Sequence, residues 1–277
     1  MSTRIGNMIR AVLTGTTLAA AGSSPAMAQQ FDPFKITNIH FESNASACDM
    51  GIQISFDTGG VSEGSVTDPN GQVVFQFGSV GGMGVTHNIT EAFQERVEPQ
   101  ITEIMAALGC ERDPEEPEIA LTELLSAWPE GKYMFRGSSA DADFRGFARL
   151  SHKVPAGTQI LEPEDGDIVP TAENLLVRWT PVTDPLLPEL GPIEIKGYHV
   201  LIADVTDPEF RPGRTKIQFD ADVPAGATSF LVSKKFLRKG RIYELEILAT
   251  ENGGNQTITE GGVFCTPPIA PADCEAP

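Results

Sequence analysis

A serine stands at the centre of the stretch that most resembles a catalytic motif. The sequence "GVSEG", Gly60 to Gly64, has the G-x-S-x-G form of a nucleophile elbow around Ser62. That chemistry needs a buried strand before the serine and a helix directly after it, so that the hydroxyl stands at a strained turn. The residues that follow, "SVTDPNGQ", are unsuited to starting a helix. A Gly/Ser turn between strands is therefore favoured over a serine hydrolase.

The other residues that could do chemistry do not form a recognisable site. The four histidines, His40, His87, His152 and His199, are scattered singly, and no H-E-x-x-H motif is present. The glycines of "GSVGGMG", Gly78 to Gly84, lack the spacing of a phosphate-binding loop and predict a flexible connection. Because paired carboxylates of a hydrolase meet only in space, an unrecognised hydrolytic site in the N-terminal part stays open as an alternative.

Four cysteines predict disulfides. In a chain sent to an oxidising compartment, Cys48, Cys110, Cys265 and Cys274 are expected to form two bridges, for which three pairings exist. We prefer Cys48–Cys110 and Cys265–Cys274, because each pair closes a loop within one inferred domain. A zinc site is disfavoured, since the sequence holds no C-x-x-C and no histidine clusters with the cysteines.

The first 28 residues have the features of an export signal. Arg4 and Arg10 give a positive start, a short apolar stretch follows, and "AMA" at Ala26 to Ala28 is a small-x-small cleavage site. The later sequence has no run of about 20 apolar residues, so no integral membrane span is expected. We expect an exported protein, periplasmic or extracellular.

The net charge limits the class of partner. Twenty basic and 38 acidic residues give a formal charge of −18 at pH 7. Such a surface repels phosphate backbones and anionic lipids, so nucleic acid and anionic membranes are not expected as partners. An acidic coat that keeps the protein soluble is the favoured interpretation. A calcium-dependent structural surface protein is an alternative suggested by the same charge, although no cofactor is otherwise expected.

Residues 29–152 predict a small α+β domain. The segments "KITNIHFES" and "MGIQISFD" alternate as strands do, and "SVTDPNGQVVFQF" has the turn residues of a hairpin. "PEGKYMFRG" and "FRGFARLSH" predict a second hairpin. A helix is expected from the apolar face formed by Val97, Ile101, Ile104, Met105 and Leu108, and a second over Glu118 to Trp128. We expect the helices to cover one face of a small antiparallel sheet.

Residues 158–266 predict an all-β sandwich, entered through a linker at 153–157 and followed by a Pro-rich tail at 267–277. "NLLVRW", "GYHVLIAD", "TKIQFDADV", "TSFLVS", "YELEILAT" and "GGVFCT" follow at the spacing typical of such folds. The tryptophan ending "LLVRW", the run "IKGYHVLIAD" and the Leu-x-x-Gly-x-x-Tyr of "LRKGRIYELEILAT" together resemble the fibronectin type III module. The resemblance implies that Trp179, Tyr198 and Tyr243 are core residues, with a tyrosine hydroxyl bonded to the backbone.

The N-terminal part resembles a domain found ahead of such modules in exported bacterial proteins of unknown function. The matching pieces are "NASACDMGIQ", "DPNG", "VEP", "WPEGKYMFRG" and "ARLSHKVPAG". The resemblance brings no catalytic residues. Where acidic residues would be expected around Ala45 to Ala47, this chain has only Asn44, Ser46 and Asp49, which weakens the case for a cation loop.

Two loops of the sandwich are the candidate binding site. In the resembled module, the loops after Trp179 and after Thr250 lie at the same pole, and long loops on a rigid scaffold are where binding usually resides. We expect an acidic pole with an exposed apolar centre, Leu186 and Leu187, that docks a protein partner; an unselected surface loop is the alternative. The candidate residues are Asp184, Leu186, Leu187, Glu189, Glu194, Glu251, Asn252 and Asn255.

The sequence thus predicts a mainly β, exported protein with two domains and a non-catalytic, binding or adhesion role. No enzyme is predicted, because no catalytic motif has the structural context that its chemistry requires. The alternatives are a secreted hydrolase or enzyme accessory protein and the calcium-dependent surface protein.

Overall fold

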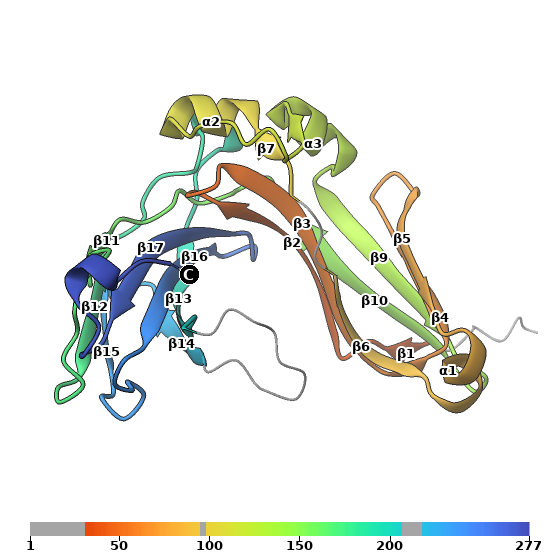
Figure 1. Cartoon of the computed structure of the whole chain (residues 1–277). Helices are drawn as coiled ribbons and strands as arrows, with labels where there is room; N and C mark the ends of the chain where they lie inside the picture. The colour runs from red at the N-terminus through yellow and green to blue at the C-terminus, as the bar shows by residue number, and fades with distance from the viewer. Residues whose placement is uncertain (1–30, 95–97, 207–217, 277) are drawn as a thin grey trace, which may run out of the picture. The chain divides into compact units, whose positions relative to one another are not determined.

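Strands dominate the structure, a computed structural model that describes residues 31–94, 98–206 and 218–276 (Figure 1). The expected export signal, residues 1–28, lies outside the described residues. The fold is mainly β, as predicted. No helix in the described ranges is long and apolar enough to cross a membrane.

The N-terminal half consists of two packed layers of strands. One sheet has the order β1 (Asp32–Pro33), β10 (Asp143–Leu150), β9 (Gly131–Ser138), β4 (Glu63–Thr67) and β5 (Val73–Gly78). The other layer contains β2 (Ile36–Asn44), β3 (Asp49–Val61), β6 (Ile89–Gln94), β7 (Gln100–Ile101) and β8 (Glu118–Ile119). Both expected hairpins are confirmed: β4 pairs with β5 and β9 pairs with β10, each antiparallel.

Alternating side chains of the two layers form the core of this half. Ile39 and Phe41 of β2 are buried, as are Ile54 and Phe56 of β3. They pack with residues of the facing sheet in one apolar cluster, where Phe34 meets the ring of Phe56 edge to face at 5.7 Å. The period of two in these segments therefore identifies the face that enters the apolar core, although His40 and Gln53 on the opposite face are also buried.

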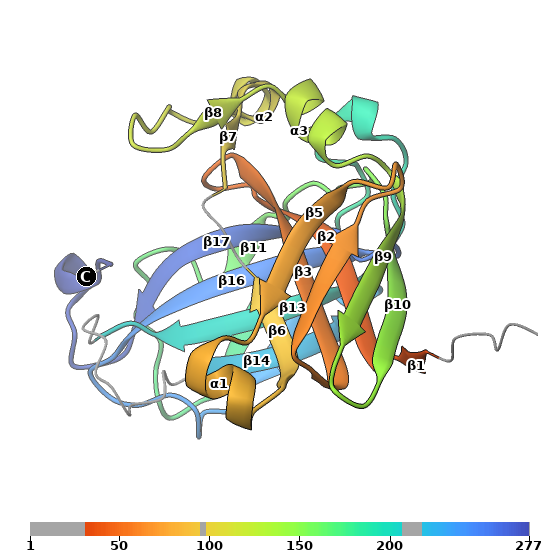
Figure 2. The same cartoon turned by 90° about the vertical axis from the view of Figure 1, so that its right-hand side faces the viewer.

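The α-helices of the described residues differ from the expected positions. They are α1 (Gly81–Thr86), which begins within the stretch expected to be a flexible connection and continues past it, α2 (Thr102–Leu108) and α3 (Leu121–Ala127). Both predicted helices begin later than expected, because β7 and β8 pair in parallel just before them; Val97 lies outside the described residues. Figures 1 and 2 place α2 and α3 at the end of the layers rather than across a sheet face.

The C-terminal half is a sandwich. A sheet of β11 (Ile160–Glu162), β12 (Leu175–Trp179) and β15 (Ser229–Val232) faces β14 (Gln218–Pro224), β13 (Ile195–Asp204), β16 (Ile242–Glu251) and β17 (Gln256–Cys265). Trp179, Tyr198 and Tyr243 are buried between the sheets, as the resemblance implied. The hydroxyl of Tyr243 accepts the backbone N–H of Arg238 at 2.8 Å. These features confirm a fibronectin type III-like sandwich.

One sheet runs through both halves. Strand β17 pairs in parallel with β2, with Gln256 opposite Glu42 and Ile258 opposite Asn44. Residues 31–277 accordingly form one compact unit. The predicted linker at 153–157 lies where the halves meet: Val154 is buried in the core of the N-terminal half, and the Pro155 carbonyl accepts the Thr257 hydroxyl at 2.5 Å. The division into domains at 29–152 and 158–266 stays a prediction.

Candidate functional site

The expected apolar centre of the binding loop is buried, so this prediction was wrong. Leu186 and Leu187 are only 7% and 5% exposed and, with Leu190 of the short helix η1 (Pro188–Leu190), belong to the core of the N-terminal half. The Leu186 N–H donates to the Val154 carbonyl at 2.9 Å, which ties the loop to the segment joining the halves. The loop is long because it crosses to the other half and fills part of its core.

Two polar residues of the predicted site are buried as well. Glu251 is 2% and Asn255 is 1% exposed. The Oδ1 of Asn255 accepts the N–H of Phe41 at 2.8 Å, and its Nδ2 donates to the carbonyls of Ser151 at 2.8 Å and Lys153 at 2.9 Å. Asn255 therefore connects the sandwich to the N-terminal half and is not available to a partner.

The remainder of the predicted pole is exposed. The side chains of Asp184, Glu189, Glu194 and Asn252 face solvent. The two loops are adjacent, as expected, because the N–H of Asn252 donates to the Glu194 carbonyl at 2.9 Å. Binding of a partner at these four residues stays a prediction.

Ser62 and His199, two of the residues considered for catalysis, lie in different halves of the molecule, and each contacts other residues of its own half. Ser62 occupies a bend between β3 and β4, with no helix after it, and its hydroxyl donates to the Ser138 carbonyl at 2.9 Å. This confirms the turn that the sequence favoured. His199 lies on β13 between Asp220 (2.8 Å) and Asp222 (3.1 Å) on an accessible face of the sandwich. Among the described residues, no group of three or more His, Cys, Asp or Glu could hold a metal ion.

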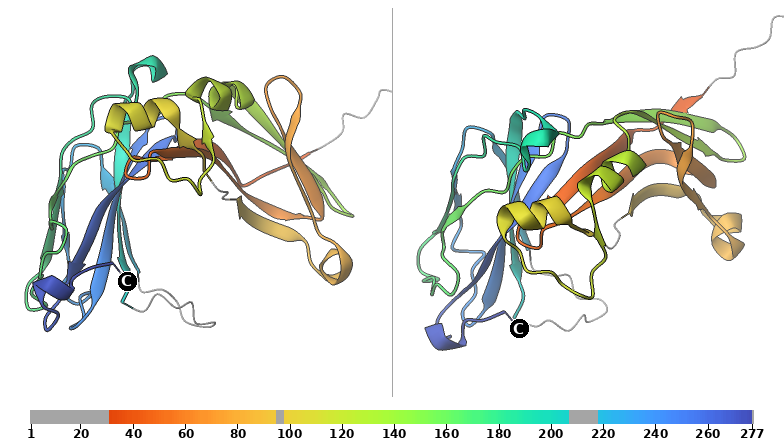
Figure 3. Two further views of the ribbon diagram at one scale, coloured as in Figure 1. Left: turned by 45° about the horizontal axis from the view of Figure 1, so that its top comes forward. Right: turned by 90° about the horizontal axis from the view of Figure 1, so that it is seen from above.

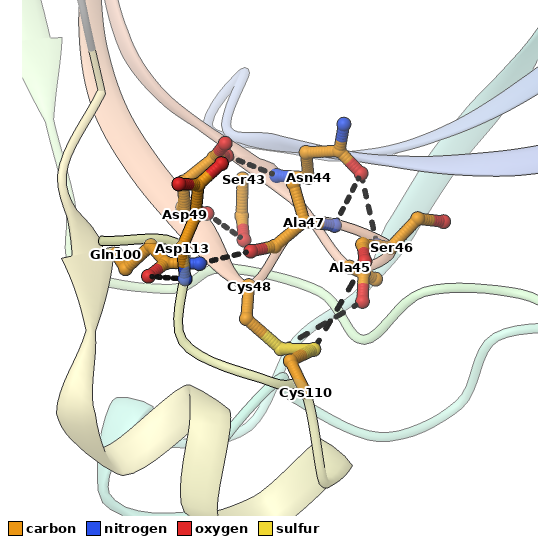
Figure 4. Close-up of a disulfide and its surroundings, with 10 residues drawn as sticks. All are labelled: Ser43, Asn44, Ala45, Ser46, Ala47, Cys48, Asp49, Gln100, Cys110 and Asp113. Atoms are coloured by element: carbon orange, nitrogen blue, oxygen red, sulfur yellow. Dashed lines mark hydrogen bonds between the residues drawn. A yellow bond between two sulfur atoms is a disulfide. The ribbon is translucent and has the colours of Figure 1, made fainter. Parts of the chain in front are cut away.

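Both predicted disulfides are present, Cys48–Cys110 and Cys265–Cys274. Figure 4 shows the first of them beneath the turn that joins β2 to β3. The Oδ1 of Asn44 accepts the N–H groups of Ser46 at 2.9 Å and Ala47 at 3.2 Å. The oxygen that could have served a cation loop is thus occupied in holding the turn.

Burial changes the pKa of two side chains near this turn and on β2. The pKa of Asp49 is raised to about 6, first because burial removes the carboxylate from water and then because of the charges of Glu116, Glu260 and Glu42; the N–H of Asn44 opposes the shift. The pKa of His40 is lowered to about 4 by burial. Asp49 is therefore partly protonated in mildly acidic solution, where His40 remains neutral.

The outer face of the β9–β10 hairpin carries a set of cations that the sequence interpretation missed. We call this set the basic face: Lys132 and Arg136 on β9, and Arg145 and Arg149 on β10, all exposed. The register puts Arg145 opposite Arg136 and Arg149 opposite Lys132. Residues two apart on a strand lie about 6.7 Å apart and directly opposed residues about 5 Å, so the four positions span about 13 Å by 5 Å. Figure 2 shows the two strands side by side.

An apolar pair separates the cations. Phe147, 53% exposed, lies opposite Met134 between the two pairs of charges. The Nζ of Lys132 lies 4.1 Å from the centre of the Phe147 ring, and the guanidinium of Arg145 lies 5.7 Å from that of Phe31. These cation–π contacts orient the charged groups without neutralising them.

The strand register opposes cations directly in the basic face. None of the ion pairs among the described residues involves its four cations. Like charges directly opposite on neighbouring strands destabilise a sheet. A chain with 38 acidic residues nevertheless holds two such pairs here. The arrangement is suited to binding an anionic group, since the Arg fork matches a carboxylate with two parallel hydrogen bonds.

Comparisons with known proteins add little to this geometry. No family model and no curated protein matches the chain. Among solved structures, it is similar to the fibronectin(III)-like modules of Clostridium thermocellum CbhA, at 8% identity over 85% of this chain and 97% of that one, with a TM-score of 0.30. It is also similar to the FN1-FN3 domains of chicken CNTN1, at 9% identity over 85% of this chain and 69% of that one, with a TM-score of 0.29.

These TM-scores are too low to assign a fold. The sandwich assignment is based on the strand order and the buried aromatic residues. The resemblance of residues 29–152 to a domain of exported bacterial proteins finds no support and stays a prediction.

Proposed function

We propose that this chain is an exported, non-catalytic binding protein that recognises an acidic protein surface through the basic face of β9 and β10. The observation that carries the proposal is the strand register, which sets Arg145 opposite Arg136 and Arg149 opposite Lys132. None of these four cations takes part in an ion pair among the described residues. A bound acidic segment would relieve the repulsion that the free protein tolerates.

The face has the composition expected of a small recognition surface. Arginine, methionine and aromatic residues, phenylalanine among them, are enriched in the cores of protein interfaces. Here three arginines surround Phe147 on strands whose backbones are fixed by the hairpin ladder. Because a rigid strand loses little conformational freedom on binding, the cations are already placed for a partner.

Two further observations agree with an exported binding role. The predicted signal at residues 1–28 and the two disulfides are typical of proteins in oxidising compartments. The exposed residues Asp184, Glu189, Glu194 and Asn252 offer a second, acidic surface, which remains the predicted partner-binding loop of the sandwich.

A short fluorescent poly-glutamate peptide tests the proposal. Fluorescence polarisation should detect binding that weakens as salt rises. The double variant Arg145→Ser, Arg149→Ser should lose at least tenfold in affinity. The matched control Arg178→Ser, Lys235→Ser removes the same charge from exposed positions on the sandwich and should bind as the native protein does. Equal losses in both variants would mean that net charge alone governs binding and would refute the proposal, as would the absence of binding.

A further inference from the structure

The chain itself carries an acidic segment whose charge matches the basic face. The segment Glu111–Glu118, which we call the acidic loop, links α2 to β8. It has five carboxylates and one arginine, and Arg112 pairs internally with Glu118 at 2.6 Å. Four carboxylates therefore remain to face the four cations. Those without an ion pair among the described residues are Glu111, Asp113, Glu115 and Glu116.

The acidic loop is held in place at both ends. Cys110, just before it, is bonded to Cys48, and Glu118 begins the short strand that pairs with Gln100. Inside the loop, the N–H of Asp113 donates to Gln100 Oε1 at 2.9 Å, and the N–H of Glu115 donates to Asp113 Oδ1 at 2.9 Å. A loop fixed in this way loses little conformational entropy when it binds.

The apolar parts of the two surfaces also correspond. Pro114 and Pro117 are exposed within the acidic loop, and Phe147 is exposed between the cations. Proline segments dock against aromatic side chains at little entropic cost, because their backbone is already restricted. The charge and the apolar groups of the loop therefore both suit the basic face.

The two surfaces of one copy do not meet. No hydrogen bond or ion pair of the described residues joins the acidic loop to β9 or β10. Figures 2 and 3 show the segment between α2 and α3 on a different side of the N-terminal half from β9 and β10. A contact between them must accordingly join two molecules.

We infer that the partner of the basic face is the acidic loop of a second copy of this chain. This inference rests on the proposed function, which it deepens by naming the acidic surface. Because different patches of the two copies meet, the contact is heterologous and produces head-to-tail chains or closed rings. The net charge of −18 opposes association at long range, but within a screening length of about 8 Å at physiological salt the local charge pairs decide.

Charge reversal in sedimentation velocity experiments tests the inference. The native protein should form oligomers that dissociate as salt is raised. The face variant Arg145→Glu, Arg149→Glu and the loop variant Glu111→Lys, Glu115→Lys should each be monomeric, with at least a tenfold loss in association constant. The control Arg178→Glu, Lys235→Glu, which has the same net charge as the face variant, should associate as the native protein does.

Mixing the two monomeric variants supplies the decisive result. Each variant then meets a complementary partner, so oligomers should return in the mixture and in a single chain that carries all four substitutions. A synthetic peptide of the sequence ERDPEEPE should dissolve the native oligomers. A variant that fails to fold would also fail to associate in the mixture, so circular dichroism is measured before each run and only variants with the native spectrum are used.

The inference and the proposed function can fail separately. A native protein that binds poly-glutamate through the basic face but sediments as a monomer at every salt concentration would overturn the inference alone, and the acidic surface would belong to another protein. Binding of neither poly-glutamate nor a second copy would overturn both.

Discussion

The side chain of Asn255 binds the backbone of Phe41 across 214 residues of sequence, its Oδ1 accepting the Phe41 N–H at 2.8 Å. The same side chain donates to two carbonyls of the segment that joins the halves. A single buried amide thus satisfies three backbone groups, one in β2 and two in the segment that follows β10.

Replacing Asn255 should destabilise the whole molecule. The substitution Asn255→Ala leaves buried backbone groups unsatisfied, and we expect a loss of about 3 kcal/mol in the free energy of unfolding. Urea unfolding followed by tryptophan fluorescence measures this, since Trp128 and Trp179 report on the two halves. The neighbouring exposed residue provides the control: Asn252→Ala should change stability by no more than about 0.5 kcal/mol. Similar effects of the two substitutions would contradict the role assigned to Asn255.

Leu187 should behave as a core residue. Because its side chain is buried, Leu187→Ser should lower the free energy of unfolding by about 3 kcal/mol. Leu231, which is 57% exposed on β15, serves as the control, and Leu231→Ser should have little effect. A fully stable Leu187→Ser protein would contradict the core role assigned to this leucine.

The two disulfides should contribute unequally to stability. The cysteines of Cys48–Cys110 are 62 positions apart in the sequence, and those of Cys265–Cys274 are 9 apart. In the chain-entropy account, the longer loop is worth about 4 kcal/mol and the shorter about 2.5 kcal/mol. Paired Cys→Ala variants should therefore show the larger fall in urea midpoint for Cys48 and Cys110. The reverse order would show that entropy of the unfolded chain is not the main contribution.

Asp49 and His40 should give opposing pH dependences. The folded-state pKa of Asp49 is raised to about 6, so its contribution to stability is lost as pH rises from about 4 to 6. The folded-state pKa of His40 is lowered to about 4, so stability is lost as pH falls from about 6.5 to 4. In Asp49→Asn only the histidine effect remains, and the gain in stability over the native protein should grow between pH 4 and 6 and then level off. Urea unfolding across this range measures the gain; a constant difference would contradict the assignment.

Reversing one charge of the basic face should stabilise the fold while removing its binding. In Arg136→Glu a like-charge pair with Arg145 becomes an opposite-charge pair, worth about 0.5 kcal/mol in favour of the folded state. Arg178→Glu on β12 is the comparison, because that arginine already pairs with Glu162 at 3.4 Å and its reversal should give no gain. A loss of stability in Arg136→Glu would show that the cations are structurally required.

The sequence predicted the buried positions of a strand well where the alternation of apolar residues within that strand is sufficient. The alternation in "LLVRW" identifies Leu175, Val177 and Trp179 as buried, and all three are. The preferred cysteine pairing is also the observed one, since each bridge closes within a half. Such features depend on residues close in the chain or on a fixed period of two.

The candidate sites depended on contacts that no local pattern reports. In the sequence, Leu186 is an apolar residue in a proline-rich loop. It is buried because the loop packs into the core of the N-terminal half, which the local sequence does not indicate. The basic face requires the register of a hairpin, because "KYMFR" and "RGFAR" become adjacent only when Met134 opposes Phe147. The sequence did contain a signal for the basic face, because on each strand two cations flank an apolar residue at every second position. Pairing the two segments in the predicted hairpin would have placed these cations on one face.

The parallel pairing of β17 with β2 also sets the order in which the protein can be completed. During synthesis the chain emerges N-terminus first. Strand β3 follows β2 directly and is available to pair with it at once, but the other edge of β2 pairs with Gln256–Ile258 near the end of the chain. Until then that edge presents unpaired backbone groups, which are a template for pairing with other chains. A chain that stops before Gln256 keeps this edge permanently open, so truncated products of this protein are expected to aggregate rather than to survive as a folded N-terminal fragment.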